Sequence, residues 1–152
     1  MPATAINHVS LAVDALEPAV DFYEEVLGLE QIPSVNSSAR GAWFQLDNGQ
    51  LHLTERAAPS PQYHHLALTV EDFAGLVATL EEREALDDTF GAPLYEFPDG
   101  AVQVYFRDPS DNLLEADWPD ISTLPADLAE RAQTREEVLG TIQTDDITLF
   151  PD

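Results

Sequence analysis

The sequence predicts an α+β fold in which a βαβββ unit occurs twice, and three observations support this. The segment that begins at His8 aligns with the segment that begins at His65 at a constant offset of 57 residues. Each segment opens with the alternation of apolar and polar residues that is typical of a half-buried strand. Apolar residues then recur at the three- and four-residue spacing of an amphipathic helix. This repetition indicates two units with the same packing pattern.

The matched positions are those that a strand and a helix would bury. They pair His8 with His65, Leu11 with Leu68, Val13 with Val70, Leu16 with Phe73 and Val20 with Val77. Two further strands follow in each copy. Residues 42–46 and 50–55 flank an Asp-Asn-Gly turn, and residues 102–106 and 113–117 flank a turn at 108–112.

These elements divide the chain into three parts. We expect a first module at 1–57, a second at 62–119 and a C-terminal extension at 120–152. Within the extension the sequence predicts a helix over 125–139 and a strand over 141–150. The two modules are expected to form a curved, cup-like mixed sheet around a metal site on a shared concave face.

The charge of the chain is strongly negative. It holds 29 Asp and Glu residues against six Arg and no Lys, which gives a net charge of -23. Hydrophobic residues nevertheless make up 44% of the chain, and their regular spacing excludes a disordered acidic chain. The composition resembles that of halophilic proteins, whose carboxylates repel one another until salt screens them.

The same composition excludes several classes of function. Without a basic patch the protein is not expected to bind nucleic acid. The chain contains no apolar run of about 18 residues, so no membrane span is predicted. No cysteine is present to act as a ligand or nucleophile. The N-terminus shows no pattern of a secretory leader. We expect a cytoplasmic protein that acts on a small molecule.

Two of the four histidines occupy equivalent positions in the repeat. His8 and His65 each stand early in the first strand of a copy, so internal symmetry would bring both imidazoles to the concave face. In the pair His64–His65, strand alternation lets only one side chain point inward, and the repeat selects His65. A single histidine on a strand is usually a core residue, whereas two at equivalent positions favour metal ligation.

The last strand of each copy supplies a further candidate ligand. Glu115 lies in the apolar stretch NLLEAD, where a buried carboxylate is unfavourable unless it is paired or bound to a metal. His52, in QLHLTE, either binds the metal or only lines the pocket. His8, His52, His65 and Glu115 together suit one Zn, Ni, Co, Mn or Fe(II) ion. Without His52, the other three form a two-His-one-carboxylate set.

Four segments together resemble the vicinal-oxygen-chelate superfamily of glyoxalase I, extradiol dioxygenases, methylmalonyl-CoA epimerase, fosfomycin-resistance enzymes and bleomycin-binding proteins. They are NHVSLAV, DFYEEVLGL, HHLALTV and YFRDPSDNLLEAD, within residues 5–118. The resemblance implies paired βαβββ modules and a metal held by His8, His52, His65 and Glu115.

Two positions depart from the family pattern. Glyoxalase-I-like members usually have Glu or Gln where this chain has His52. The DPxGN turn of the family has Gly where this chain has Asp111. Asp tolerates the left-handed backbone conformation better than most residues, so the turn is still expected to form.

The resemblance implies chemistry on a small substrate whose adjacent oxygens bind the metal. We expect a glyoxalase-I-like lyase or isomerase in which Glu115 moves a proton between neighbouring carbons. An extradiol-type ring-cleaving dioxygenase is the alternative, because Tyr105 stands ten residues before Glu115, close to that signature. A fosfomycin-modifying enzyme is a further alternative, since Ser10, Tyr63 and Tyr105 match the pocket hydroxyls of such enzymes. These enzymes also need a cationic pocket for the phosphonate, and this sequence shows none. Bleomycin-type drug binding is the non-enzymatic alternative.

Other residues could shape the pocket. Trp43, Tyr63 and Tyr105 are candidates for an apolar lining, whereas Phe44 and Phe106 fit core packing. Any of Arg40, Arg56 and Arg107 near the cup could hold an anionic substrate, although Arg107 could equally pair with surface carboxylates. We expect a homodimer, and the cup could close within one chain or across the dimer.

Overall fold

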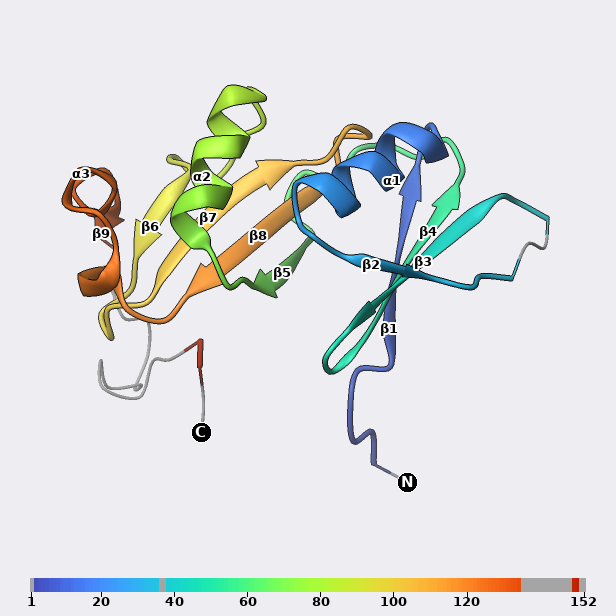
Figure 1. Ribbon diagram of the computed structural model, residues 1–152, viewed down its shortest axis with the longest axis horizontal. Helices are drawn as coiled ribbons and strands as arrows, with labels where there is room; N and C mark the ends of the chain where they lie inside the picture. Colours follow the sequence, from blue (N-terminus) through green and yellow to red (C-terminus); the bar gives the residue numbers. More distant parts are fainter. Residues whose placement is uncertain (1, 36–37, 135–148, 151–152) are drawn as a thin grey trace. The chain divides into compact units, whose positions relative to one another are not determined.

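The computed structural model describes residues 2–35, 38–134 and 149–150, and the chain folds into two compact units (Figure 1). Unit 1 consists of the residues up to 61 together with 107–112. Unit 2 consists of 62–106 and the described residues from 113 onward. Within the described part of the chain, no helix is long and apolar enough to cross a membrane.

Unit 1 is a βαβββ module. Its elements are β1 (His8–Val13), α1 (Leu16–Glu25), β2 (Glu30–Ile32), β3 (Gly41–Leu46) and β4 (Gly49–Glu55). The strands form one sheet in the order β1-β4-β3-β2. β1 runs parallel to β4, and the other neighbours are antiparallel.

The core of unit 1 lies between α1 and one face of this sheet. α1 packs against β3 and β4, and its buried residues are Leu16, Ala19, Phe22 and Tyr23, which follow helical spacing. From the sheet, Val13, Phe44, Leu51 and Leu53 are fully buried. Strand alternation therefore directs the intervening residues of β1 and β4 to the opposite face.

Unit 2 repeats the same topology. Its elements are β5 (His65–Thr69), α2 (Phe73–Glu82), β6 (Leu94–Glu96), β7 (Val102–Arg107) and β8 (Leu113–Trp118), followed by a 3-10 turn (Ile121–Thr123), α3 (Ala126–Ala129) and β9 (Gln133–Thr134). The sheet order is β5-β8-β7-β6-β9, with β5 parallel to β8. α2 contacts β8. The predicted α+β fold with two βαβββ modules is confirmed.

The C-terminal extension differs from the prediction. The helix expected over 125–139 is wrong for residues 130–134, because α3 ends at Ala129, and positions 135–139 lie outside the described residues. Gln133 and Thr134 instead pair with β6 as a short parallel strand. An open strand edge offers unpaired backbone groups, and pairing with them outweighs a local helix propensity. The strand expected over 141–150 lies outside the described residues, apart from its last two positions.

The described units also differ from the expected modules at the turn between β7 and β8. Residues 107–112 group with unit 1 because polar bonds tie them there. The hydroxyl of Tyr23 donates to Oδ2 of Asp108 at 2.8 Å, and Nδ2 of Asn112 donates to the carbonyl of Ala12 at 2.8 Å. Burial, and then the charge of Asp108, hold the pKa of Tyr23 well above its ordinary value. Asp111 adopts a φ of 66°, the left-handed conformation expected for it.

Candidate functional site

β1 and β4 place two of the predicted ligands side by side on the helix-free face of the unit 1 sheet. In their parallel register, His8 lies opposite Gln50 and Ser10 lies opposite His52. The rings of His8 and His52 stack with their centroids 4.3 Å apart and their planes 17° apart. Unit 1 therefore gathers two imidazoles at one point of its surface.

His52 is held between two rings. The indole of Trp43, on β3, stacks on it at a centroid distance of 4.0 Å, and its Nε2 lies 2.9 Å from Oε1 of Gln50. Partial burial, and then the neighbouring His8, lower the pKa of His52. A neutral imidazole has the lone pair that a metal requires. Trp43, predicted as a pocket residue, contacts a candidate ligand directly.

β5 and β8 bring together the other two predicted ligands. Nε2 of His65 lies 2.9 Å from Oε2 of Glu115. Nδ1 of His65 lies 2.7 Å from the carbonyl oxygen of Tyr63, a contact that fixes the ring with Nε2 toward the carboxylate. Glu115 is 3% exposed, as its apolar surroundings predicted. His64 is exposed and precedes the start of β5.

A buried hydrogen-bond chain orients this carboxylate. Gln103, on β7, donates to Oε1 of Glu115, and the hydroxyl of Tyr105 donates to Oε1 of Gln103 at 3.2 Å. Gln103 is 4% exposed and Tyr105 is also 4% exposed. Gln103 was not among the predicted site residues. The sequence feature that could have identified Gln103 is that it is the one polar residue between apolar neighbours in the strand VQVYF.

A second buried carboxyl group lies beside Glu115. Asp117, two residues further along β8 and so on the same face, is 7% exposed, and its Oδ1 has no hydrogen-bond partner. Burial, and then the hydrogen bond and charge of Glu115, raise the pKa of Asp117 to about 8. At neutral pH this carboxyl is mainly protonated. Two buried carboxyl groups with an unpartnered oxygen fit a site that receives a cation.

Aromatic rings surround His65. Phe90 and Tyr105 contact its ring edge-on, at centroid distances of 5.7 and 5.6 Å. Tyr63, a predicted pocket residue, is 56% exposed, and its ring lies 6.1 Å from that of Phe90. Phe90 was not predicted from the sequence. Phe44 and Phe106 are fully buried in the core, as expected.

The described residues of neither unit gather a complete ligand set by themselves. Across the residues that the structure describes, no group of three or more His, Cys, Asp or Glu side chains could hold a metal ion. Unit 1 contributes a pair of imidazoles, and unit 2 contributes an imidazole fixed against a buried carboxylate. This donor chemistry fits Zn and the related divalent ions.

Comparison with known proteins agrees with this arrangement of strands. Residues 5–116 match the family described as the Glyoxalase/Bleomycin resistance protein/Dioxygenase superfamily. The structure is similar to a lactoylglutathione lyase from Agrobacterium tumefaciens, with 24% identity and a TM-score of 0.59, over 76% of this chain and 94% of that one. It is similar to a glyoxylase/bleomycin resistance protein/dioxygenase domain from Frankia sp. EAN1pec, with 23% identity and a TM-score of 0.61, over 78% and 99%.

A fosfomycin resistance protein, FosX from Listeria monocytogenes, is also similar. It shares 16% identity and a TM-score of 0.62, over 76% of this chain and 93% of that one. A variant of FosX was solved with Mn(II) and dihydroxypropylphosphonic acid. At these identities, the structural likeness establishes the fold.

Proposed function

This chain belongs to the Glyoxalase/Bleomycin resistance protein/Dioxygenase superfamily, and on that basis we propose that it is a divalent-metal-dependent, glyoxalase-I-like lyase or isomerase. One observation carries the proposal. Nε2 of His65 lies 2.9 Å from a carboxylate, Glu115, that is almost fully buried. A buried carboxylate beside an oriented imidazole suits metal binding and proton transfer more than it suits stability.

The proposed ligands are His8 and His52 from unit 1 with His65 and Glu115 from unit 2. The two pairs would meet on one ion, either within one chain or across a homodimer. On a six-coordinate ion such as Mn, four protein donors would leave two positions, where two adjacent oxygens of a small substrate would bind. When bound, the metal supplies Lewis-acid stabilisation of the negative charge that develops on those oxygens.

Glu115 is the proposed general base. Its carboxylate would accept the proton from the carbon of a hemithioacetal that carries the sulfur, and would return it to the adjacent carbonyl carbon. The hydroxyl proton of the first carbon would move to the oxygen of the second, so the product is an α-hydroxy thioester and the reaction needs no oxidant. Gln103 and Tyr105 would hold the carboxylate in place, and Phe90 would limit the access of water.

An extradiol-type ring-cleaving dioxygenase is the second candidate. Its support is the position of His52, whose ring is stacked between His8 and Trp43. If His52 keeps that position, only His8, His65 and Glu115 would bind the ion, which is the set that non-haem Fe(II) oxygenases use. Tyr105, in contact with His65, would then face the substrate.

The metal site is tested by a pair of alanine variants. His65→Ala should weaken the binding of added Zn or Mn about 100-fold or more, because it removes a ligand. His64→Ala is the matched control, since His64 is exposed and precedes β5. Metal content per chain after dialysis is the measurement. Equal loss in both variants would reject the proposed ligand.

The reaction is tested by assays with and without oxygen. The metal-loaded protein should convert the hemithioacetal of methylglyoxal and a thiol under strict anaerobiosis. Consumption of catechols with oxygen uptake would instead support the dioxygenase. If activity disappears only when oxygen is removed, the leading proposal is wrong.

A further inference from the structure

Two glutamines stand next to His52 on the helix-free face of the unit 1 sheet. Gln50 precedes His52 by two residues on β4, and Gln45, on β3, is the register partner of Gln50. Nε2 of Gln45 donates to two backbone carbonyls, that of Leu46 at 2.6 Å and that of Gly49 at 3.0 Å. Because a carbonyl oxygen can only accept, these contacts fix which end of the Gln45 amide is the nitrogen.

The orientation of Gln45 determines that of Gln50. Oε1 of Gln45 faces Gln50 and accepts a hydrogen bond from its Nε2 at 3.4 Å. If the Gln50 amide were reversed, two oxygens would face each other at this distance, which is unfavourable because neither can donate. Oε1 of Gln50 therefore faces His52, and it lies 2.9 Å from Nε2 of that ring. Since this oxygen can only accept, Nε2 of His52 carries a proton.

A proton on Nε2 leaves the neutral His52 ring with its lone pair on Nδ1. A metal binds the imidazole nitrogen that carries no proton. The two faces of the ring are covered by Trp43, at a centroid distance of 4.0 Å, and by His8, at 4.3 Å. Among the residues that the structure describes, none forms a hydrogen bond with Nδ1 of His52. A metal can therefore reach His52 only at the edge that carries Nδ1.

His65 has the opposite arrangement. Its Nδ1 lies 2.7 Å from the carbonyl oxygen of Tyr63, which can only accept, so Nδ1 carries a proton. When His65 binds a metal, Nε2 is the nitrogen that remains. The difference follows from the acceptors, because a backbone carbonyl stands beside Nδ1 in unit 2, whereas the amide oxygen of Gln50 stands beside Nε2 in unit 1.

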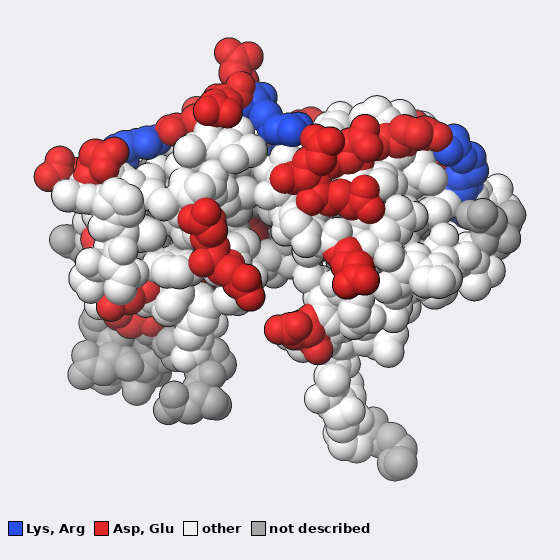
Figure 2. Space-filling view, viewed as in Figure 1, with Lys and Arg blue, Asp and Glu red and all other residues white. Residues whose placement is uncertain are grey.

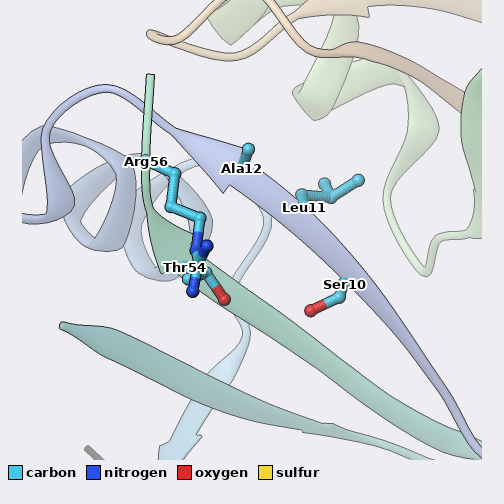
Figure 3. A pocket seen from close by; sticks show the side chains of 5 residues that line it. All are labelled: Ser10, Leu11, Ala12, Thr54 and Arg56. Carbon is cyan, nitrogen blue, oxygen red and sulfur yellow. The ribbon is translucent and has the colours of Figure 1, made fainter. Parts of the chain in front are cut away.

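An open hollow of about 340 Å³ adjoins His52 along the same strands (Figure 3). Its lining includes Ser10, the register partner of His52, and Thr54, which follows His52 by two residues on β4. Gln50 precedes His52 by the same interval, so Gln50 and the hollow lie on opposite sides of His52 along the strand. Open space is therefore present on the side of His52 that Gln50 does not occupy.

The stacked rings of His8 and His52 cannot both bind one ion without a movement. A metal lies in the plane of the imidazole that binds it, and these two planes are only 17° apart, with centroids separated by 4.3 Å. Trp43 and Gln50 hold His52, whereas His8 is exposed and bonds to the side chain of the neighbouring Asn7. His52 is therefore the fixed ring, and His8 is the one that must turn.

We propose that Gln50 is a positioning residue that keeps the proton of His52 on Nε2, so that His52 presents Nδ1 to the metal whereas His65 presents Nε2. The proposal deepens the proposed function and rests on it for the metal ion itself. Gln45 acts one step further away, because it orients Gln50. Groups that hydrogen-bond to a metal-binding histidine orient its ring and fix its tautomer, and their loss weakens metal binding about 10- to 100-fold.

The position of the proton is tested on the metal-free, isotope-labelled full chain. NMR spectra that correlate ring protons with ring nitrogens, recorded at a pH at which His52 is neutral, report which nitrogen is protonated. The wild type should carry the proton on Nε2 alone. Gln50→Leu removes the acceptor and should give a mixture of both tautomers, whereas Gln50→Glu keeps an acceptor and should retain the wild-type pattern. A proton on Nδ1 in the wild type, or a wild-type pattern in Gln50→Leu, would overturn the proposal.

The nitrogen that binds the ion is identified with a magnetic isotope of cadmium, a divalent ion related to Zn. Cadmium on Nε2 is three bonds from both ring protons, Hδ2 and Hε1, whereas cadmium on Nδ1 is three bonds from Hε1 only. His52 should therefore show coupling to Hε1 alone, and His65 should show coupling to both protons. Coupling of both ring protons of His52, or of neither, would overturn the proposal.

The affinity for cadmium completes the test. Gln50→Leu should weaken binding about tenfold or more, and Gln50→Glu should restore it. Gln31→Leu is the matched control, because Gln31 is an exposed glutamine on β2 of the same sheet, and it should stay within about twofold of the wild type. Equal weakening in Gln31→Leu and Gln50→Leu would reject the role of Gln50. Absence of cadmium coupling at His65 would instead reject the proposed metal site, and the tautomer comparison in metal-free protein would still decide the role of Gln50.

Discussion

In the turn after β7, Asp111 has a backbone conformation that residues with a side chain rarely adopt. Its φ of 66° lies in the left-handed region, where glycine is favoured because it lacks a Cβ. Its carboxylate makes only a long contact with Nε of Arg107, at 3.9 Å. The strain at this position is therefore not offset by a strong interaction of the side chain.

Replacement of Asp111 should accordingly raise or lower the free energy of unfolding according to how well the new residue tolerates this φ angle. Asp111→Gly should raise the free energy of unfolding by about 0.5–1 kcal/mol, because it relieves the strain. Asp111→Ala should lower it by a similar amount, because alanine keeps a Cβ and tolerates this conformation less well than aspartate. Urea unfolding of the three proteins gives the comparison. A shift of the same sign in both variants would show that the side chain, and not φ, controls stability here.

At the scale of single residues, the sequence was informative where a pattern existed. The repeat distinguished His65 from His64, and the apolar neighbours of Glu115 predicted its burial. Gln103 and Asp117 were not predicted, because a polar residue in an apolar strand belongs to either face until the pairing of β7 and β8 is known. Phe90 lies in the segment between α2 and β6, where no periodicity applies.

At the scale of elements, β8 is unusual because it carries two buried carboxyl groups on one face. The pKa of Asp117 is raised from 3.8 to about 8, chiefly by burial and then by Glu115. The folded protein therefore keeps a proton that the unfolded chain releases above about pH 4. It follows that the contribution of Asp117 to stability falls as the pH rises from about 4 to 8.

Asp117→Asn should remove this dependence in metal-free protein. The neutral amide has no charge to bury, so the variant should be more stable than the wild type at pH 8 and nearly equal to it below pH 4. Thermal unfolding in the presence of a chelator, across this range, is the measurement. Asp120→Asn is the control, because hydrogen bonds from Ser122 lower the pKa of the exposed Asp120 and give it the opposite sign. A constant difference between Asp117→Asn and the wild type at every pH would contradict the assignment.

The elements were predicted well where hydrophobic alternation and turn residues coincide. The Asp-Asn-Gly turn and the alternating residues beside it predicted β3 and β4, which span Gly41–Leu46 and Gly49–Glu55. Residues 133–134 form a strand and not part of the helix expected over 125–139, because helical spacing is a local signal, whereas β9 depends on the edge of β6, some 40 residues earlier in the chain. The grouping of 107–112 with unit 1 depends on Tyr23, which lies 85 residues before Asp108 in the sequence.

At the scale of the whole molecule, carboxylates predominate among the charged side chains. Figure 2 shows many more acidic than basic side chains on the visible face of both units. Composition predicted this surface, because the core positions are apolar and leave most charged residues in solvent. The sequence also predicted four candidate ligands, two in each copy of the repeat. It did not predict that His8 stacks on His52 or that His65 contacts Glu115, because repeat symmetry relates positions without stating which strands lie side by side.

The carboxylate surface leads to a prediction about salt. With a net charge of -23, the folded chain repels itself, and this repulsion is greatest at low ionic strength. The Debye length falls from about 10 Å at 0.1 M salt to about 3 Å at 1 M, so the repulsion continues to weaken beyond the range that screens ordinary ion pairs. The melting temperature should therefore keep rising with KCl up to molar concentration. A triple variant, Asp21→Asn with Glu24→Gln and Glu82→Gln, removes three exposed charges of α1 and α2 and should show a smaller rise. A melting temperature that stays flat from low salt to molar KCl would contradict the halophilic interpretation while leaving the fold unaffected.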